Sequence, residues 1–267
     1  MSELKILSDK IVNKLKLRTK PVGLKVFKEG LGELSEKLLR PRKHLHQKLT
    51  LCQMIGLSRF NGIAVGAELE DMGCPGTMLI FGMIRPPSFI REGRLSYGLY
   101  TETQEDGVKL DLTMPIWKYG AKAIATAPLD ATPFDPSVVV IYGTPAQIMM
   151  LVAGYIYKAG EPVGSSSYAK AGSDLAIVAS MLDGKPKTFI PGLGDRIVGH
   201  VEEYELGFVT PTNILDDIVY GMENQEKSDF IVYPPKPILV YPAKFEELPV
   251  IGKYYKQILD EVEKREQ

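Results

Sequence analysis

Two cysteines are the residues of this sequence best suited to chemistry, because a cysteine thiolate is both a strong nucleophile and a soft metal ligand. Cys74 lies on a turn between Gly73 and Pro75-Gly76, at the start of an apolar segment, and Cys52 lies early in a predicted helix, behind a basic stretch. The positive end of a helix and neighbouring bases both lower the pKa of a thiol. We therefore predict Cys52 and Cys74 as catalytic thiols of a substrate or cofactor site. Two alternatives stay open: free cysteines are often small buried apolar residues, and the pair would also suit a regulatory disulfide.

Metal binding by these thiols needs more ligands than the cysteines of one chain supply. The sequence has two cysteines, whereas a zinc or iron–sulfur site built from thiolates needs four. Such a site would have to be shared across a homodimer or completed by His44 or His46, whose spacing from Cys52 matches no standard zinc motif. A metal or iron–sulfur redox protein with a site shared in a homodimer is therefore an alternative, and the identity of any cofactor stays unknown.

A glycine-rich turn, Gly192-Leu193-Gly194-Asp195-Arg196, is a second candidate for ligand binding. Its glycines let a ligand approach the backbone closely, and an arginine can bind a carboxylate or phosphate through two hydrogen bonds. The order of its residues is not the G-x-G-x-x-G dinucleotide fingerprint. We predict Gly194, Asp195 and Arg196 as ligand-binding residues, with a structural turn and a local salt bridge as the alternative.

Lys25 is the third candidate, because it interrupts an apolar strand predicted over Pro21–Phe27. In that alternating pattern Lys25 shares one face of the strand with Gly23 and Phe27. An unpaired buried ammonium is costly, so Lys25 must reach solvent, a carboxylate or a ligand. We include it among the cofactor-binding candidates; a position on an edge strand is the alternative.

The elements that must position these residues alternate between strands and helices. A helix over Lys48–Arg59 carries Cys52, and the β-branched run Ser137–Tyr142 predicts a strand buried on both faces. Thr144 and Pro145 then begin a helix over Ala146–Lys158 that stops at Gly160. The other predicted elements are helices over Leu4–Leu17, Ser173–Leu182 and Asn213–Met222, a short strand over Ile63–Val65, a helix or strand over Met78–Met83, a long excursion over Pro86–Gly107, an antiparallel strand pair over Asp111–Trp117 and Ala121–Pro128, and an extended segment over Thr188–Pro191.

This alternation predicts an α/β or α+β fold with a mixed sheet flanked by helices. Each half of the chain also has a strand, a helix that carries a glutamine (Gln53 or Gln147), a glycine-containing loop and an apolar segment. An internal duplication of that strand–helix–loop–helix unit, with a site between the halves, would account for the recurrence. Chance recurrence of a common pattern is the alternative. We include Gln53 and Gln147 among the cofactor-binding candidates.

Five motifs in this order resemble a known family, the one called domain of unknown function 169, an archaeal conserved region. The motifs are Pro21 to Val26, Leu51-Cys52-Gln53, Gly73-Cys74, Ser137 to Tyr142 with Thr144-Pro145-Ala146-Gln147, and Gly194-Asp195-Arg196. The resemblance covers roughly Leu15 to Glu223 and implies that Cys52, Cys74, Lys25, Gln147 and Arg196 converge in space. It implies no particular reaction. Family members often have further cysteines near the positions of Ala176 and Leu193, which this sequence lacks.

Composition narrows the classes of function. The formal net charge of the chain is -1, whereas a dedicated nucleic-acid-binding protein normally has a basic excess. Met1 to Lys20 has no apolar signal-peptide region, and the most apolar run, Val138 to Ile156, is broken by Gly143, Thr144 and Pro145. We therefore expect a soluble cytoplasmic protein with no nucleic-acid or membrane partner.

These observations lead to a main α/β domain over residues 1–233 and a tail over residues 234–267. The tail has a proline-rich part, a strand-like Ile238–Tyr241 and an amphipathic helix near Lys253–Glu263, expected to pack on the domain or on a partner. We expect a protein that binds a small molecule or cofactor in a thiol-lined cleft, with an enzyme as one form of that function and a homodimer as a candidate assembly. The alternative from another class is an accessory or scaffold protein that binds a partner through its C-terminal segment.

Overall fold

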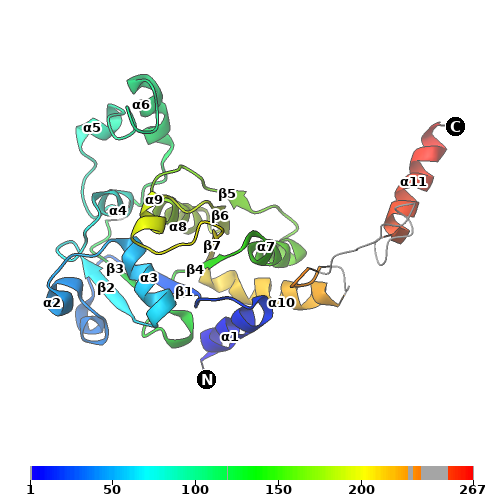
Figure 1. Ribbon diagram of the computed structural model, residues 1–267, viewed down its shortest axis with the longest axis horizontal. Coiled ribbons are helices and arrows are strands. Elements are labelled where there is room, and N and C mark those ends of the chain that lie inside the picture. The colour runs from blue at the N-terminus through cyan, green and yellow to red at the C-terminus, as the bar shows by residue number, and fades with distance from the viewer. Residues whose placement is uncertain (1, 119, 228–230, 236–251, 267) are drawn as a thin grey trace.

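One mixed sheet organises the structure (Figure 1). The computed structural model describes residues 2–118, 120–227, 231–235 and 252–266. Within them, seven strands are ordered β2-β3-β1-β4-β7-β6-β5. The strands are β1 (Val22–Phe27), β2 (Val65–Glu68), β3 (Ala123–Pro128), β4 (Val138–Gly143), β5 (Gly164–Ser165), β6 (Lys187–Phe189) and β7 (Leu206–Pro211). Only β5 and β6 pair in parallel among these strands, so the predicted mixed α/β sheet is confirmed.

Helices cover both faces of this sheet, because its central strand β4 is apolar on both sides. Val138, Val140 and Tyr142 belong to one core, and Val139 and Ile141 belong to another, as the alternation of side chains along a strand requires. We call these two sides the first face and the second face. The first face is covered by α3 (Leu51–Asn61), α4 (Pro75–Ile80) and α8 (Gly172–Asp183), and the second by α1 (Glu3–Leu15), α7 (Pro145–Ala159) and α10 (Leu215–Glu226).

Close backbone contact joins two helices of the second face, α7 (Pro145–Ala159) and α10. A Cβ atom placed on Gly221 would lie 2.1 Å from the carbonyl oxygen of Gly154, and one placed on Gly154 would lie 2.5 Å from the carbonyl oxygen of Ile218. Only glycine lets the two helices approach this closely. The contact therefore holds α10 against α7 and completes the core of the second face.

Capping side chains begin the two helices that carry the predicted glutamines. The hydroxyls of Thr50 and Thr144 accept hydrogen bonds from the backbone N–H groups of Gln53 and Gln147, and each glutamine side chain accepts one from the backbone N–H of its threonine. This reciprocal pair is a capping box, which satisfies donors that the first turn of a helix leaves free. The predicted helix Ala146–Lys158, with its Thr144 cap and its end at Gly160, is confirmed.

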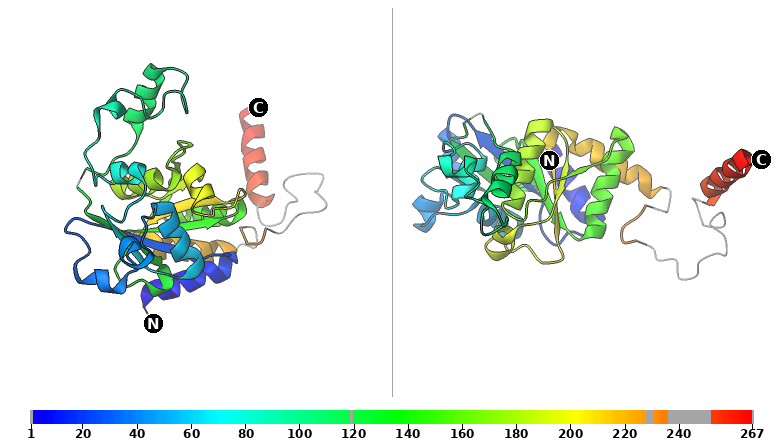
Figure 2. Two further views of the ribbon diagram at one scale, coloured as in Figure 1. Left: turned by 60° about the vertical axis from the view of Figure 1, so that its left-hand side comes forward. Right: turned by 90° about the horizontal axis from the view of Figure 1, so that it is seen from above.

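A projection from the domain connects α4 to β3, and it contains α5 (Ser88–Arg91) and α6 (Gln104–Thr113) (Figure 2). The prediction of a strand over Asp111–Trp117 is wrong, because Asp111 to Thr113 form the last residues of α6. The Thr103 hydroxyl caps that helix by accepting from the backbone N–H of Asp106. The strand expected over Ala121–Pro128 does form, as β3, but it pairs with β1 and β2.

Most other predicted elements are present with small shifts of their ends. The predicted turn Gly192–Arg196 is instead mostly a short helix, α9 (Leu193–Ile197), because the Asp195 side chain caps its first turn. The remaining elements are η1 (Gly32–Lys37), α2 (Pro41–Leu45), η2 (Leu129–Ala131), η3 (Thr212–Ile214) and α11 (Gly252–Glu266). β7 was not expected from the pattern of the sequence.

The suggested duplication of one unit stays unconfirmed. The strand order is symmetric in outline about the β1–β4 pair, with β3 and β2 on one side and β7 and β6 on the other. The helices do not follow that symmetry, because α3 covers the first face and α7 covers the second. A twofold axis that exchanges two antiparallel neighbouring strands is perpendicular to the sheet. Such an axis would place α3 and α7 on the same face, which is not observed.

The end of the chain includes a helix close to the one expected. α11 (Gly252–Glu266) covers the predicted Lys253–Glu263, whereas the predicted strand Ile238–Tyr241 lies outside the described residues. Packing of this tail on the domain or on a partner stays a prediction. Among the helices that the structure describes, none has both the length and the apolar content needed to cross a membrane.

Candidate functional site

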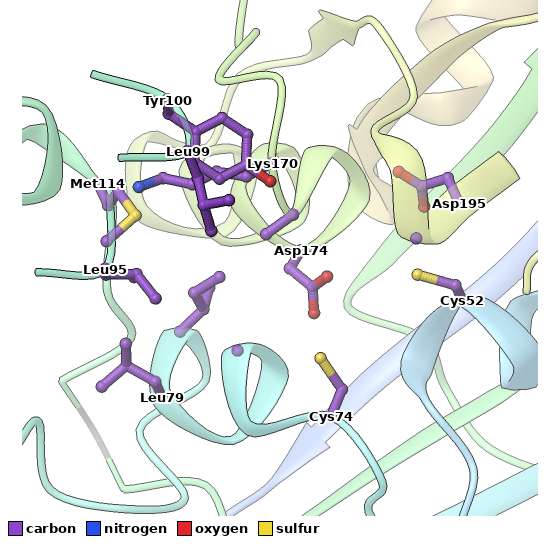
Figure 3. Close-up of a pocket in the computed structure, with 14 residues that line it drawn as sticks. Cys52, Cys74, Leu79, Leu95, Leu99, Tyr100, Met114, Lys170, Asp174 and Asp195 are labelled. Carbon is purple, nitrogen blue, oxygen red and sulfur yellow. The ribbon is translucent and has the colours of Figure 1, made fainter. Parts of the chain in front are cut away.

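A cavity of about 310 Å³ lies on the first face, beside the starts of four helices (Figure 3). One end is polar, with two thiols and two carboxyl groups from Cys52, Cys74, Asp174 and Asp195. The rest is largely apolar, and its larger side chains are Leu79, Ile80, Leu95, Leu99, Tyr100 and Met114. Lys170, Ala171, Gly76 and Gly194 complete the lining. We call this cavity the thiol pocket.

Each of the two thiols and two carboxyl groups at the polar end comes from the start of a different helix. Cys52 is the second residue of α3, Cys74 is the N-cap of α4, Asp174 is the third residue of α8, and Asp195 is the third residue of α9. Helices that begin at one place bring side chains far apart in sequence to one small volume. The structure thus brings together both predicted thiols and Gly194-Asp195.

Asp195 is held as an internal anion by groups of its surroundings. Its carboxylate accepts hydrogen bonds from the Ser173 hydroxyl at 2.6 Å, the Gly192 backbone N–H at 2.8 Å and the Ser173 backbone N–H at 3.3 Å. These donors belong to the starts of α8 and α9, where backbone N–H groups favour negative charge. Asp195 therefore fixes the two helix starts against each other and adds a negative charge to the wall of the thiol pocket.

Asp174 is also buried, but its carboxyl has no comparable set of hydrogen bonds. Its side chain points into the pocket (Figure 3), the residue is 2% exposed, and its Oδ1 atom has no hydrogen-bond partner. Burial raises its pKa to about 7, and the negative charge of Asp195 adds to that rise. The nearby Thr77 hydroxyl opposes the rise, although it has no hydrogen bond of normal geometry. Asp174 thus keeps its proton to a much higher pH than an exposed aspartate does.

Cys52 corrects one expectation from the sequence. We predicted that the helix start and the basic stretch lower its pKa, but burial raises the pKa of this thiol, and the charges of Asp195 and Asp174 raise it further. A thiolate beside two carboxyl groups in a partly buried position is unfavourable. Cys52 therefore remains a neutral thiol at neutral pH.

A buried ion pair connects the projection to the start of α8. The Lys170 ammonium lies 2.6 Å from the Asp111 carboxylate, and both also contact the Ser96 hydroxyl. Only 9% of the Lys170 side chain and 0% of the Asp111 side chain is exposed. Leu95, Leu99, Tyr100 and Met114 of the pocket wall lie near these contacts in the chain, so the ion pair helps to position that wall.

Four of the predicted ligand-binding residues do not line the thiol pocket. Lys25 lies in β1, between β3 and β4 and not on an edge strand. Its side chain is on the side of the strand away from Val22 and Leu24, which belong to the first-face core. Gln147 binds the backbone carbonyl of Leu15 on the second face. Gln53 belongs to the capping box of α3.

Arg196 is the fourth of these residues. Its guanidinium donates to the backbone carbonyl of Glu202 at 2.6 Å, which joins α9 to the loop that follows it. The expected convergence of Lys25, Gln147 and Arg196 with the two cysteines is therefore not observed, because these side chains serve strand and helix contacts elsewhere.

Reasoning from the sequence missed Asp174, Lys170 and Asp111. The sequence does contain a clue to Asp174, because this residue is an acid at the start of an otherwise apolar helix. The segment is Gly172-Ser173-Asp174-Leu175-Ala176-Ile177-Val178. Lys170 and Asp111 had none, because their charges are ordinary in isolation. Among the described residues, no group of three or more histidine, cysteine or acidic side chains is arranged to hold a metal ion. The homodimeric metal site stays a prediction.

Residues 10–221 match the family described as "Uncharacterised ArCR", domain of unknown function 169. The chain belongs to that family. The match includes all the residues that line the thiol pocket. The resemblance inferred from the motifs is confirmed.

A curated relative also has no described function. "Uncharacterized protein MJ0308" from Methanocaldococcus jannaschii is 26% identical over 206 residues, which are 76% of this chain and 85% of the relative. No solved structure matches this chain.

Proposed function

We propose that this protein binds a small molecule in the thiol pocket. The observation that carries the proposal is the pocket itself, about 310 Å³ with apolar walls and a compact polar end. Small-molecule sites in proteins commonly combine an apolar lining with a few polar groups that orient the ligand. Here those groups are Cys52, Cys74, Asp174 and Asp195.

An enzyme that acts on the bound molecule is the more specific form of the proposal. A group with a pKa near the working pH is well placed to donate or accept a proton, and the pKa of Asp174 is raised to about 7. Cys74 is the candidate thiol for contact with a substrate, whereas the raised pKa of Cys52 favours a hydrogen-bonding role for that thiol.

Native mass spectrometry of anaerobically purified protein, with an absorbance spectrum and metal analysis, tests the proposal. We expect extra mass on the native protein that is lost on unfolding. The substitution Gly76→Leu narrows the pocket with little backbone strain, because a Cβ on Gly76 would meet only Cys74 Sγ, at 3.5 Å. Gly164→Leu, in the exposed strand β5, is its matched control.

The proposal predicts that Gly76→Leu loses the bound mass and Gly164→Leu keeps it. The variants Cys52→Ser and Cys74→Ser then show which thiol touches the ligand. Ligand retention and thiol reactivity that no pocket variant changes would remove the pocket from consideration. Bound metal that needs Cys52 or Cys74 would instead favour the homodimeric metal site.

A second candidate function is partner binding through the C-terminal segment. Apolar side chains recur along one stripe of α11, where Tyr254, Ile258 and Val262 are 54%, 57% and 47% exposed. Helices with such a stripe commonly bind in an apolar groove. Deletion of all residues after Tyr233 should abolish association with a partner while the main domain stays folded. Association that survives this deletion would exclude the idea.

A further inference from the structure

We infer that the thiol pocket takes an organic amine, with its protonated nitrogen on Asp174 and its apolar body against the opposite wall. The inference rests on the proposed function and names the class of ligand. It assigns Asp174 the role of binding the ammonium group.

The first step is the unfilled hydrogen-bonding capacity of Asp174. The residue is 2% exposed, its side chain points into the cavity, and its carboxyl accepts no hydrogen bond of normal geometry from the described residues (Figure 3). Oδ1 is closed off beside the Thr77 hydroxyl, so Oδ2 is the oxygen that faces the cavity. Leaving a buried acceptor without a partner costs free energy. A ligand that brings an N–H donor to Oδ2 from the cavity supplies a hydrogen bond that the carboxyl lacks.

The second step is the sign of the charge around Asp174. Asp195 is a carboxylate held by three hydrogen bonds, and its backbone donors at the start of α8 and α9 are thereby used. Lys170 is the only basic residue that lines the described pocket, and its ammonium pairs with Asp111. The polar end thus has a net negative charge, which attracts a cation and repels an anion.

The third step is the shape of the rest of the cavity. Beyond the polar end the walls are formed mainly by Leu79, Ile80, Leu95 and Met114, which offer no charge to a second polar group. A ligand with an ammonium at one end and a hydrocarbon body at the other fits both ends. Burial of that body supplies the larger part of the affinity.

A panel of probes that differ only in the head group tests the inference. The amines are 2-phenylethylamine, isopentylamine and hexylamine, each compared with the alcohol and the carboxylate of the same carbon skeleton. Binding is measured by isothermal titration calorimetry at pH 8, where the amines are protonated. We expect at least one amine to bind about tenfold or more tightly than its alcohol and its carboxylate.

Two aspartate-to-asparagine variants, each of which removes one carboxyl group, test whether the preference for the amine depends on Asp174. Asp174→Asn should remove the preference for the amine, and Asp216→Asn, an exposed site on α10 of the second face, should keep it. Equal or tighter binding of alcohols or carboxylates would overturn the amine inference and leave the pocket as a binding site. Failure of every amine to bind would also overturn it, while the native-mass experiment judges the proposed function separately.

Discussion

The Asp174 carboxyl and the Cys52 thiol lie in the polar end of one cavity, and burial affects both in the same direction. Each group loses water when it is buried, and the charge of Asp195 opposes a second negative charge nearby. The pKa of each group is therefore higher than in the free amino acid side chain. This cost to the folded protein is typical of residues retained for binding or catalysis.

Replacement of Asp174 by asparagine should stabilise the protein at pH 8. The pKa of Asp174 is raised from 3.8 to about 7 on folding, so the native state holds more protons than the unfolded state between those values. Stability from this group therefore falls as the pH rises from about 4 to about 7. We expect Asp174→Asn to gain about 2 kcal/mol at pH 8 and to flatten the pH dependence.

Urea denaturation at several pH values from 5 to 8 measures this effect. Asp216→Asn serves as the control, because Asp216 is exposed on the second face. If wild type and Asp174→Asn had parallel pH profiles, Asp174 would not be the buried titrating group described here.

The Cys52 thiol should resist alkylation in the folded protein. Its pKa is raised by burial and by two carboxyl groups, and only the thiolate reacts. In a Cys74→Ser background, we expect iodoacetamide at pH 8 to modify Cys52 about a hundredfold or more slowly when folded than when unfolded in guanidinium. Mass spectrometry gives both rates, and similar values would contradict the raised pKa.

At the scale of elements, one buried ion pair helps to attach the projection with α5 and α6 to the domain. Lys170 and Asp111 are 9% and 0% exposed in their side chains. Removal of one partner of such a pair leaves the other charge buried and alone, whereas apolar replacement of both is often neutral. A single substitution should therefore destabilise the projection more than substitution of both partners does.

Substitution Asp111→Ala should destabilise the protein by about 3 kcal/mol and speed hydrogen exchange in residues 86–118. The double variant Lys170→Met with Asp111→Leu should recover most of the loss. Glu105→Ala is the matched control on α6, because its partner Lys109 is 65% exposed and such pairs contribute little. Unchanged exchange in Asp111→Ala would show that the projection is held by other contacts.

The α7–α10 contact predicts an unusual effect of alanine in a helix. Alanine normally favours a helix over glycine by about 1 kcal/mol, but a Cβ at Gly221 would lie 2.1 Å from Gly154 O. We expect Gly221→Ala to lower the free energy of unfolding by about 2 kcal/mol. Gly76→Ala in α4 is the control, because a Cβ there would lie 3.5 Å from Cys74 Sγ, and it should be neutral or stabilising. Equal changes in the free energy of unfolding at both sites would contradict the close approach of α7 and α10.

At the scale of the whole molecule, the residues that form the cores on both faces of the sheet precede the C-terminal helix in the chain. Among the described residues, every member of the buried core lies within residues 7–222, and from beyond α10 only Ile231 and Tyr233 pack against the second-face core. A chain that ends at Pro235 should therefore keep the Tm of the full chain. A chain that ends at Lys227 should melt at a lower temperature, and calorimetry compares the three.

Much of the fold was predictable because local patterns determine local structure. The β-branched run Val138 to Val140 required a strand buried on both faces, and Thr144-Pro145 with Gly160 required the start and end of α7. Asp111 to Trp117 was misread because a short alternating run fits both a strand and a helix end. The cap from Thr103 decided in favour of the helix.

The sequence by itself determined most of the elements, the family and the two thiols as candidates, because motifs and periodicity are properties of neighbouring residues. Only the tertiary structure decided that Asp174 and Asp195 share a pocket with Cys52 and Cys74, and that Lys25 and Gln147 do not. It also reversed the expected shift in the pKa of Cys52. The reason is physical: burial and charge at a site depend on which helix starts meet there, and residues far apart in the chain control that meeting.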